Sequence, residues 1–179
     1  IIMAAAMADD VTIENIIPQH VEALTSKLIE MGVNLEIGID SIRIQKSASL
    51  KAVDITTQTY PGFATDLQQP MTSLLTQAEG PSNVKETIYA ERFKHCAELQ
   101  RMGANIGVHP AQATITGPTP LFGSKVVATD LRCGASLVVA GLMADGVTEI
   151  HEVYHIDRGY DDIDNKLTAL GAKFWREEV

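Results

Sequence analysis

Apolar residues recur at helical spacing in three stretches of the chain, and a glycine follows each stretch. The first stretch is residues 21–31 and is followed by Gly32; Gly103 and Gly171 close the other two. Each glycine stands where a helix C-cap needs a left-handed backbone, so we expect three helices that end there, each followed by a short strand. Pro18 is well placed to begin the first of these helices.

Two further segments, residues 1–8 (IIMAAAMA) and 133–143 (CGASLVVAGLM), are apolar or small nearly all the way around a helix. A helix that is apolar on every side is typically buried on every side. We therefore expect both helices to lie in the interior of the fold, unlike the three helices with a polar face.

The chain also repeats itself. Residues 65–88 and 129–150 both begin Thr-Asp-Leu, run through an apolar helix, break at a glycine-containing turn and enter a short strand. Residues 1–15 match the end of the same pattern. The repetition predicts an α/β (α+β) fold of three related units, with buried helices inside and sheets around them. The expected strands are residues 11–16, 41–45, 104–108, 113–116 and 147–153.

Composition narrows the class of protein. The 179 residues suffice for one compact domain, and shares of 45% hydrophobic and 21% charged residues are those of a globular protein. The net charge of -9 and the lack of any Lys/Arg run disfavour nucleic acid as a partner. No apolar stretch approaches the length of a membrane span, and residues 1–8 lack the pattern of a signal peptide. We expect neither nucleic acid nor membrane as a partner.

The usual metal, redox and nucleotide motifs are missing from the sequence. Cys96 and Cys133 have no metal or redox spacing and fit a reducing compartment, where free thiols are mostly small buried hydrophobes. The five histidines form no HExxH pattern, and there is no GxGxxG, P-loop or GxSxG motif. The sequence therefore predicts no metal and no cofactor.

Candidate chemistry rests on a few charged residues. Arg92, Arg132 and Arg158 lie near helix starts or in the loops before them, where a guanidinium could bind phosphate or carboxylate; each could equally be an ordinary surface residue. Asp66 and Asp130 both follow a threonine and precede an apolar helix. They could be N-caps, or a carboxylate held ionised by arginine could be a general base. Composition alone leaves these alternatives open.

Four motifs together resemble the UDP-N-acetylglucosamine enolpyruvyl transferases. They are YPGFATDLQ (60–68), ERF with RMGA (91–104), TDLR with ASLV (129–138) and HIDRGY (155–160), in family order over nearly the whole chain. The wider family includes 5-enolpyruvylshikimate-3-phosphate synthase, which has a similar fold but different motifs at these places.

The resemblance implies an inside-out α/β barrel of three βαβαββ units. Residues 1–179 would form the carboxy-terminal of two such domains, with the first unit truncated at its start. The family's other domain, with its loop cysteine, lysine–asparagine pair and further arginine, is not in this sequence, and Cys133 does not replace the cysteine. We therefore expect the chain alone to be inactive, with the amino-terminal catalytic domain of the same protein as its partner.

The implied reaction moves the enolpyruvyl group of phosphoenolpyruvate to the 3′-hydroxyl of UDP-N-acetylglucosamine and releases phosphate. It is the first committed step of cytoplasmic peptidoglycan synthesis, on which bacterial cell shape and division depend. By the resemblance, Asp66 contacts the sugar 3′-hydroxyl and is proposed as its base. Ile88 occupies a backbone position that contacts the sugar nucleotide, and Asp130 resembles a second active-site aspartate.

The arginines complete the implied site. Arg132 and Arg158 resemble the residues that face phosphoenolpyruvate, and Arg92 belongs to the same cationic rim. Two other functions remain open at this stage: a 5-enolpyruvylshikimate-3-phosphate synthase-like transferase, or a non-catalytic module of the same fold that binds a sugar nucleotide.

Overall fold

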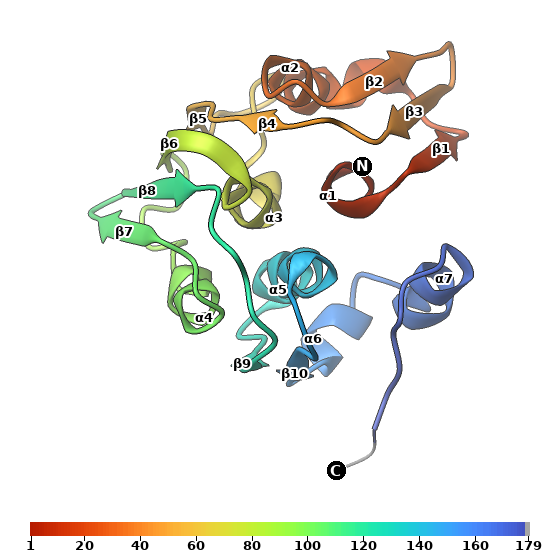
Figure 1. The fold of residues 1–179 in the computed structure, drawn as a ribbon. Coiled ribbons are helices and arrows are strands. Elements are labelled where there is room, and N and C mark those ends of the chain that lie inside the picture. Colours follow the sequence, from red (N-terminus) through yellow and green to blue (C-terminus); the bar gives the residue numbers. More distant parts are fainter. Residues whose placement is uncertain (178–179) are drawn as a thin grey trace.

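Three helices lie at the centre of the molecule, and short sheets stand around them (Figure 1). The computed structural model describes residues 1–177. The central helices are α1 (Ile2–Met7), α3 (Gln68–Leu75) and α5 (Leu131–Met143). Helices α3 and α5 pack along each other, and α1 contacts both. All of α3 is buried, as are residues 133–140 of α5, so the predicted interior position of the apolar segment 133–143 is confirmed for most of its length.

Helix α1 is less enclosed than its sequence predicts. Ile2 is buried, but Met3, Ala4, Ala5 and Ala6 are only partly so. Burial depends on the neighbours that a helix has, and the contacts of α1 run mainly to α3, α5 and one strand. The expectation of burial on every side is therefore wrong for this helix.

The three outer helices are α2 (Glu22–Glu30), α4 (His95–Arg101) and α7 (Ile163–Ala169). Each is closed by its predicted glycine in the left-handed region, with φ of 87°, 103° and 97° in chain order. In all three caps the N–H groups of the glycine and of the next residue bond to carbonyls three and five residues back, at 2.9–3.0 Å. The predicted glycine caps are confirmed. A 3₁₀ turn, η1 (Pro18–Val21), leads into α2 with proline in its first turn, as predicted.

Two of the sheets share one strand order. The first has the antiparallel order β1-β3-β2, and the second contains the antiparallel order β6-β8-β7. In the first sheet, Ile42 and Ile44 of the middle strand point into the core and are fully buried. The strands are β1 (Asp10–Glu14), β2 (Asn34–Ile37), β3 (Ser41–Gln45), β6 (Ala78–Lys85), β7 (Ile106–His109) and β8 (Gln112–Gly117).

Short parallel strands complete the sheets. Strands β4 (Leu50–Lys51) and β5 (Ile55–Thr56) pair with the two ends of β6, and β9 (Lys125–Val127) pairs with β10 (Glu149–His151). The chain passes from β5 to β6 through the central helix α3, and from β9 to β10 through the central helix α5. Among the described residues the sheets stay separate and form no closed barrel.

Several expected strands differ from the structure. Gly80 lies inside β6 with φ 106°, not in a turn, and Thr87 and Ile88 follow that strand as a loop. The strand predicted over 147–153 is limited to residues 149–151, because its parallel neighbour β9 is only three residues long. No strand follows Gly171 within the described residues, where no neighbouring strand pairs with the chain. No helix among residues 1–177 is long and apolar enough to cross a membrane.

Candidate active site

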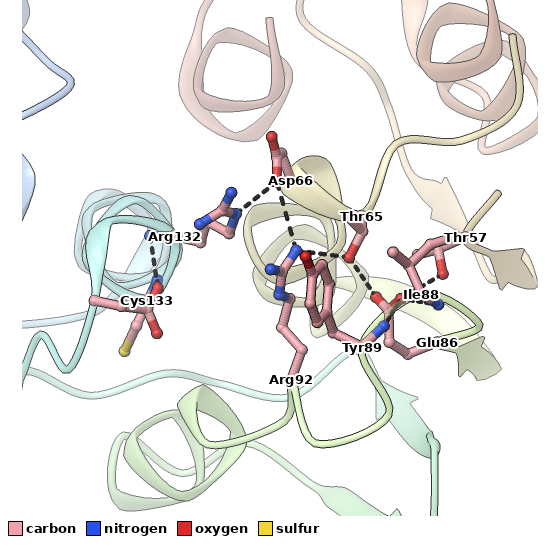
Figure 2. Close-up of polar contacts among 10 residues, drawn as sticks. Thr57, Thr65, Asp66, Glu86, Ile88, Tyr89, Arg92, Arg132 and Cys133 are labelled. Atoms are coloured by element: carbon pink, nitrogen blue, oxygen red, sulfur yellow. Dashed lines mark hydrogen bonds and ion pairs between the residues drawn. The ribbon is translucent and has the colours of Figure 1, made fainter. Parts of the chain in front are cut away.

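Three charged side chains from distant parts of the chain meet beside the amino-terminal ends of α3 and α5 (Figure 2). Asp66 lies in the 3₁₀ turn η2 (Thr65–Leu67) before α3, Arg132 lies in the first turn of α5, and Arg92 lies in the loop before α4. Arg132 Nε donates to Asp66 Oδ1 at 2.6 Å, and Arg92 Nη1 lies 3.5 Å from the same oxygen. The cluster therefore holds two cations around one carboxylate.

The three side chains of this cluster differ in their exposure to solvent. The Asp66 side chain is 62% exposed, whereas Arg132 is 33% and Arg92 15% exposed. The guanidinium of Arg92 also lies over the ring of Tyr89, 4.3 Å from its centroid, which restricts where it can point. Two guanidinium groups beside one carboxylate can bind an anionic ligand. The accessible carboxylate can accept a proton from a ligand bound there.

The two aspartates, which are similar in sequence, have different structural roles. Asp130 is the N-cap of α5: its Oδ1 accepts from the backbone N–H groups of Arg132 at 2.8 Å and Cys133 at 3.0 Å. Asp66 makes no such cap, because its carboxylate turns away from its own helix toward the arginines. The N-cap interpretation is confirmed for Asp130 and wrong for Asp66.

Arg158 makes no hydrogen bond to this cluster within residues 1–177. It follows α6 (Tyr154–Asp157), is exposed, and lies with its guanidinium carbon 5.4 Å from the ring centroid of Tyr154. Helix α6 packs closely on α5 because Gly134 of α5 has no side chain. A Cβ added at Gly134 would stand 2.4 Å from Ile156 Cγ1. The segment from Ile156 to Gly159 therefore lies against the end of α5 that carries Arg132.

A buried carboxylate stands behind the exposed cluster. Glu86 is 2% exposed, and its Oε1 accepts from Thr57 Oγ1 at 2.7 Å and from the N–H groups of Ile88 at 2.8 Å and Tyr89 at 3.1 Å. Its Oε2 accepts from Thr65 Oγ1 at 2.8 Å. Burial alone would raise the pKa of Glu86, but these hydrogen bonds to the ionised form outweigh it and lower the pKa.

Sequence reasoning did not find Glu86. The available signal is alternation, since Ser82, Val84 and Glu86 are successive inward positions along β6 and just beyond it, and all three are buried. Tyr160, the last residue of the HIDRGY motif, is half-buried. Burial raises the pKa of its phenol, and it lies close enough to Arg132 and Asp66 for both charges to act on it.

Both thiols and one histidine are buried. Cys96 and Cys133 are buried, and burial raises the pKa of both, to about 12 for Cys96. Burial likewise lowers the pKa of His95 to about 3, so its imidazole is neutral. Within residues 1–177, no three His, Cys, Asp or Glu side chains gather as a metal site would require.

The chain is similar to curated carboxyvinyltransferases. It is 57% identical over 178 residues to UDP-N-acetylglucosamine 1-carboxyvinyltransferase 2 of Geobacillus kaustophilus and 58% identical over 181 residues to the protein of that name from Bacillus subtilis. Each alignment covers 99% of this chain but only 42% of the relative. The chain thus spans less than half the length of the curated relatives that it matches.

Solved structures agree on the fold. The enolpyruvyl transferase NikO from Streptomyces tendae matches with a TM-score of 0.88 at 27% identity, over 97% of this chain and 42% of that one. An EPSP synthase from Acinetobacter baumannii matches with a TM-score of 0.69 at 20% identity over 98% of this chain and 42% of its own, which speaks for the fold alone. The family model described as EPSP synthase (3-phosphoshikimate 1-carboxyvinyltransferase) matches residues 1–167. The chain therefore belongs to the EPSP synthase family of enolpyruvyl transferases.

Proposed function

We propose that the protein containing this chain transfers the enolpyruvyl group of phosphoenolpyruvate to the 3′-hydroxyl of UDP-N-acetylglucosamine. The observation that carries the proposal is the exposed carboxylate of Asp66, held by Arg132 at 2.6 Å and approached by Arg92. The reaction joins an alcohol to an anionic enol ester, so it needs a base for the hydroxyl proton and cations for the phosphate and carboxylate. The names of the two curated relatives support the same sugar nucleotide and the same transferred group.

In this proposal Asp66 accepts the hydroxyl proton, while Arg132 and Arg92 hold the carboxylate in place and meet the anionic substrate. Arg158 would add a further cation from the adjoining turn. Asp130 then serves the site by capping α5, which holds the backbone of Arg132 in place. The backbone N–H of Ile88 already donates to Glu86, so a sugar-nucleotide contact at this residue would be made by its carbonyl oxygen.

The described chain supplies one side of such a site. The cluster is open to solvent on this side, since Asp66 is 62% and Arg132 33% exposed, and solvent and salt screen the attraction of Arg132 for an anion. We infer that residues 1–179 act as the carboxy-terminal domain of a two-domain enzyme and that this domain is an inside-out barrel of three βαβαββ units. The amino-terminal domain of the same protein would complete the active site. Closure of two domains would exclude water and bring further charges onto the substrates. The place of the reaction would be cytoplasmic peptidoglycan synthesis, with its consequences for cell shape and division.

Phosphate release by the intact protein tests this function. With phosphoenolpyruvate and UDP-N-acetylglucosamine, we expect stoichiometric phosphate and a nucleotide product heavier by one enolpyruvyl group, found by mass spectrometry. Residues 1–179 alone, assayed in parallel, should stay at background. Turnover only with shikimate 3-phosphate would favour the EPSP synthase-like alternative, and nucleotide binding without phosphate release would favour a binding module; either result would overturn the proposal.

A further inference from the structure

Glu86 joins two parts of the candidate site that are otherwise separate in the sequence. On one side its Oε2 accepts from Thr65, the residue before Asp66. On the other its Oε1 accepts from the backbone of Ile88 and Tyr89, at the start of the loop that carries Arg92. One buried side chain thus contacts both the turn and the loop (Figure 2).

The direction of the hydrogen bonds requires a carboxylate at this position. Arg92 Nη1 donates to Thr65 Oγ1 at 2.7 Å, and arginine has no acceptor, so the threonine hydroxyl accepts there and gives its own proton to Glu86. Including Thr57, four donors converge on the two oxygens of Glu86. An amide at the same place would offer one oxygen and turn an NH₂ group toward one of these donors.

We propose that Glu86 is a positioning residue, which fixes the turn bearing Asp66 and the loop from Ile88 to Arg92 relative to each other. It touches neither substrate in this proposal and acts through the residues that do. Its kinetic consequence rests on the proposed function, whereas its effect on the loop does not. The backbone of Arg132 is held separately, by its place in α5 and the cap that Asp130 provides, so Glu86 should leave that backbone in position.

Amide hydrogen exchange tests the effect on the loop without any substrate. The perturbation is Glu86→Gln in the intact protein, and the matched control is Glu79→Gln, the same change at an exposed glutamate of β6. Hydrogen bonds to charged acceptors are strong enough that we expect exchange at Ile88 and Tyr89 to speed up by about tenfold or more in Glu86→Gln. The amides of β6 should exchange as in the wild type. Unchanged exchange at both loop amides would overturn the proposal.

Steady-state kinetics test the effect on the reaction. Misplacing a reactive group by about an ångström can cost roughly 10²-fold, so Glu86→Gln should lower kcat by about that factor and raise KM for UDP-N-acetylglucosamine. KM for phosphoenolpyruvate should rise less than KM for UDP-N-acetylglucosamine, because Arg92 moves with the loop whereas the backbone of Arg132 is held independently in α5. Glu79→Gln should match the wild type throughout. Equal loss for both substrates would indicate general damage to the fold and would contradict a positioning role.

A second variant keeps the test decisive if Glu86→Gln does not fold. Thr65→Val removes two hydrogen bonds, the one that Thr65 donates to Glu86 and the one that it accepts from Arg92. The bonds from Ile88 and Tyr89 to Glu86 stay intact. We expect a lower kcat with wild-type exchange at those two amides; a wild-type kcat would overturn the proposal. An inactive wild-type protein would refute the proposed function, and the exchange measurements would still decide the role of Glu86.

Discussion

Replacing Asp66 with asparagine separates a catalytic carboxylate from a structural one. The asparagine side chain would keep the shape of the aspartate and lose its charge and its basicity. The Asp66 side chain is 62% exposed, and exposed ion pairs such as this one with Arg132 contribute only about 0–1 kcal/mol to stability. For a protein of this size or larger, a loss of that order lowers Tm by less than about 4 °C.

The expected effect of Asp66→Asn on turnover is much larger. A positioned general base contributes roughly 10²- to 10⁴-fold, which corresponds to about 2.7–5.4 kcal/mol of activation free energy. We therefore expect kcat in the phosphate-release assay to fall by roughly 10²-fold or more while the melting temperature barely moves. If the ion pair were purely structural, Asp66→Asn would lower the melting temperature slightly and leave kcat unchanged.

The matched control for Asp66→Asn is Asp10→Asn. Asp10 is also an exposed aspartate paired with an arginine, Arg43, whose Nε lies 2.9 Å from Asp10 Oδ1, but it belongs to the first sheet, outside the cluster. It should show a similarly small change in stability and wild-type turnover. Near-normal turnover of Asp66→Asn in the intact protein would refute the assignment of Asp66 as the base.

Three further predictions concern other residues. Arg158→Lys keeps the charge but loses the planar fork, so it should raise KM for phosphoenolpyruvate and spare KM for the sugar nucleotide; equal changes in both would rule out this role. Cys96 and Cys133, whose burial raises their pKa, should react slowly with an alkylating reagent at neutral pH, as followed by mass spectrometry, and rapid labelling of either would contradict their burial. Because hydrogen bonds lower the pKa of Glu86 in the folded state, its contribution to stability is complete above its unfolded pKa, about 4.3, and is lost as pH falls through the lower folded value. The difference in unfolding free energy between wild type and Glu86→Gln, measured from about pH 6 to about pH 3, should therefore shrink with falling pH; a constant difference would mean that the charge of Glu86 does not matter.

Local features could be predicted from the sequence because their causes are local. A left-handed residue is needed wherever a helix closes with this cap, and Gly32, Gly103 and Gly171 supply it within a few residues of each helix end. The buried helix α5 follows equally from its own composition. The motif resemblance anticipated the family, since it depends on the order of residues and not on their contacts.

Only the tertiary structure decided which residues act together. Asp66 and Asp130 share the same sequence context, yet one carboxylate bonds to its own helix and the other to an arginine 66 residues away. Glu86 is a polar residue at an inward position, and four hydrogen-bond donors stabilise its carboxylate. Two of these donors come from segments more than 20 residues distant. Sequence patterns report what a residue's near neighbours require. The pairing of charges across α3, α5 and the loop before α4 is set by how the helices pack, and that packing brings together residues that no local pattern connects.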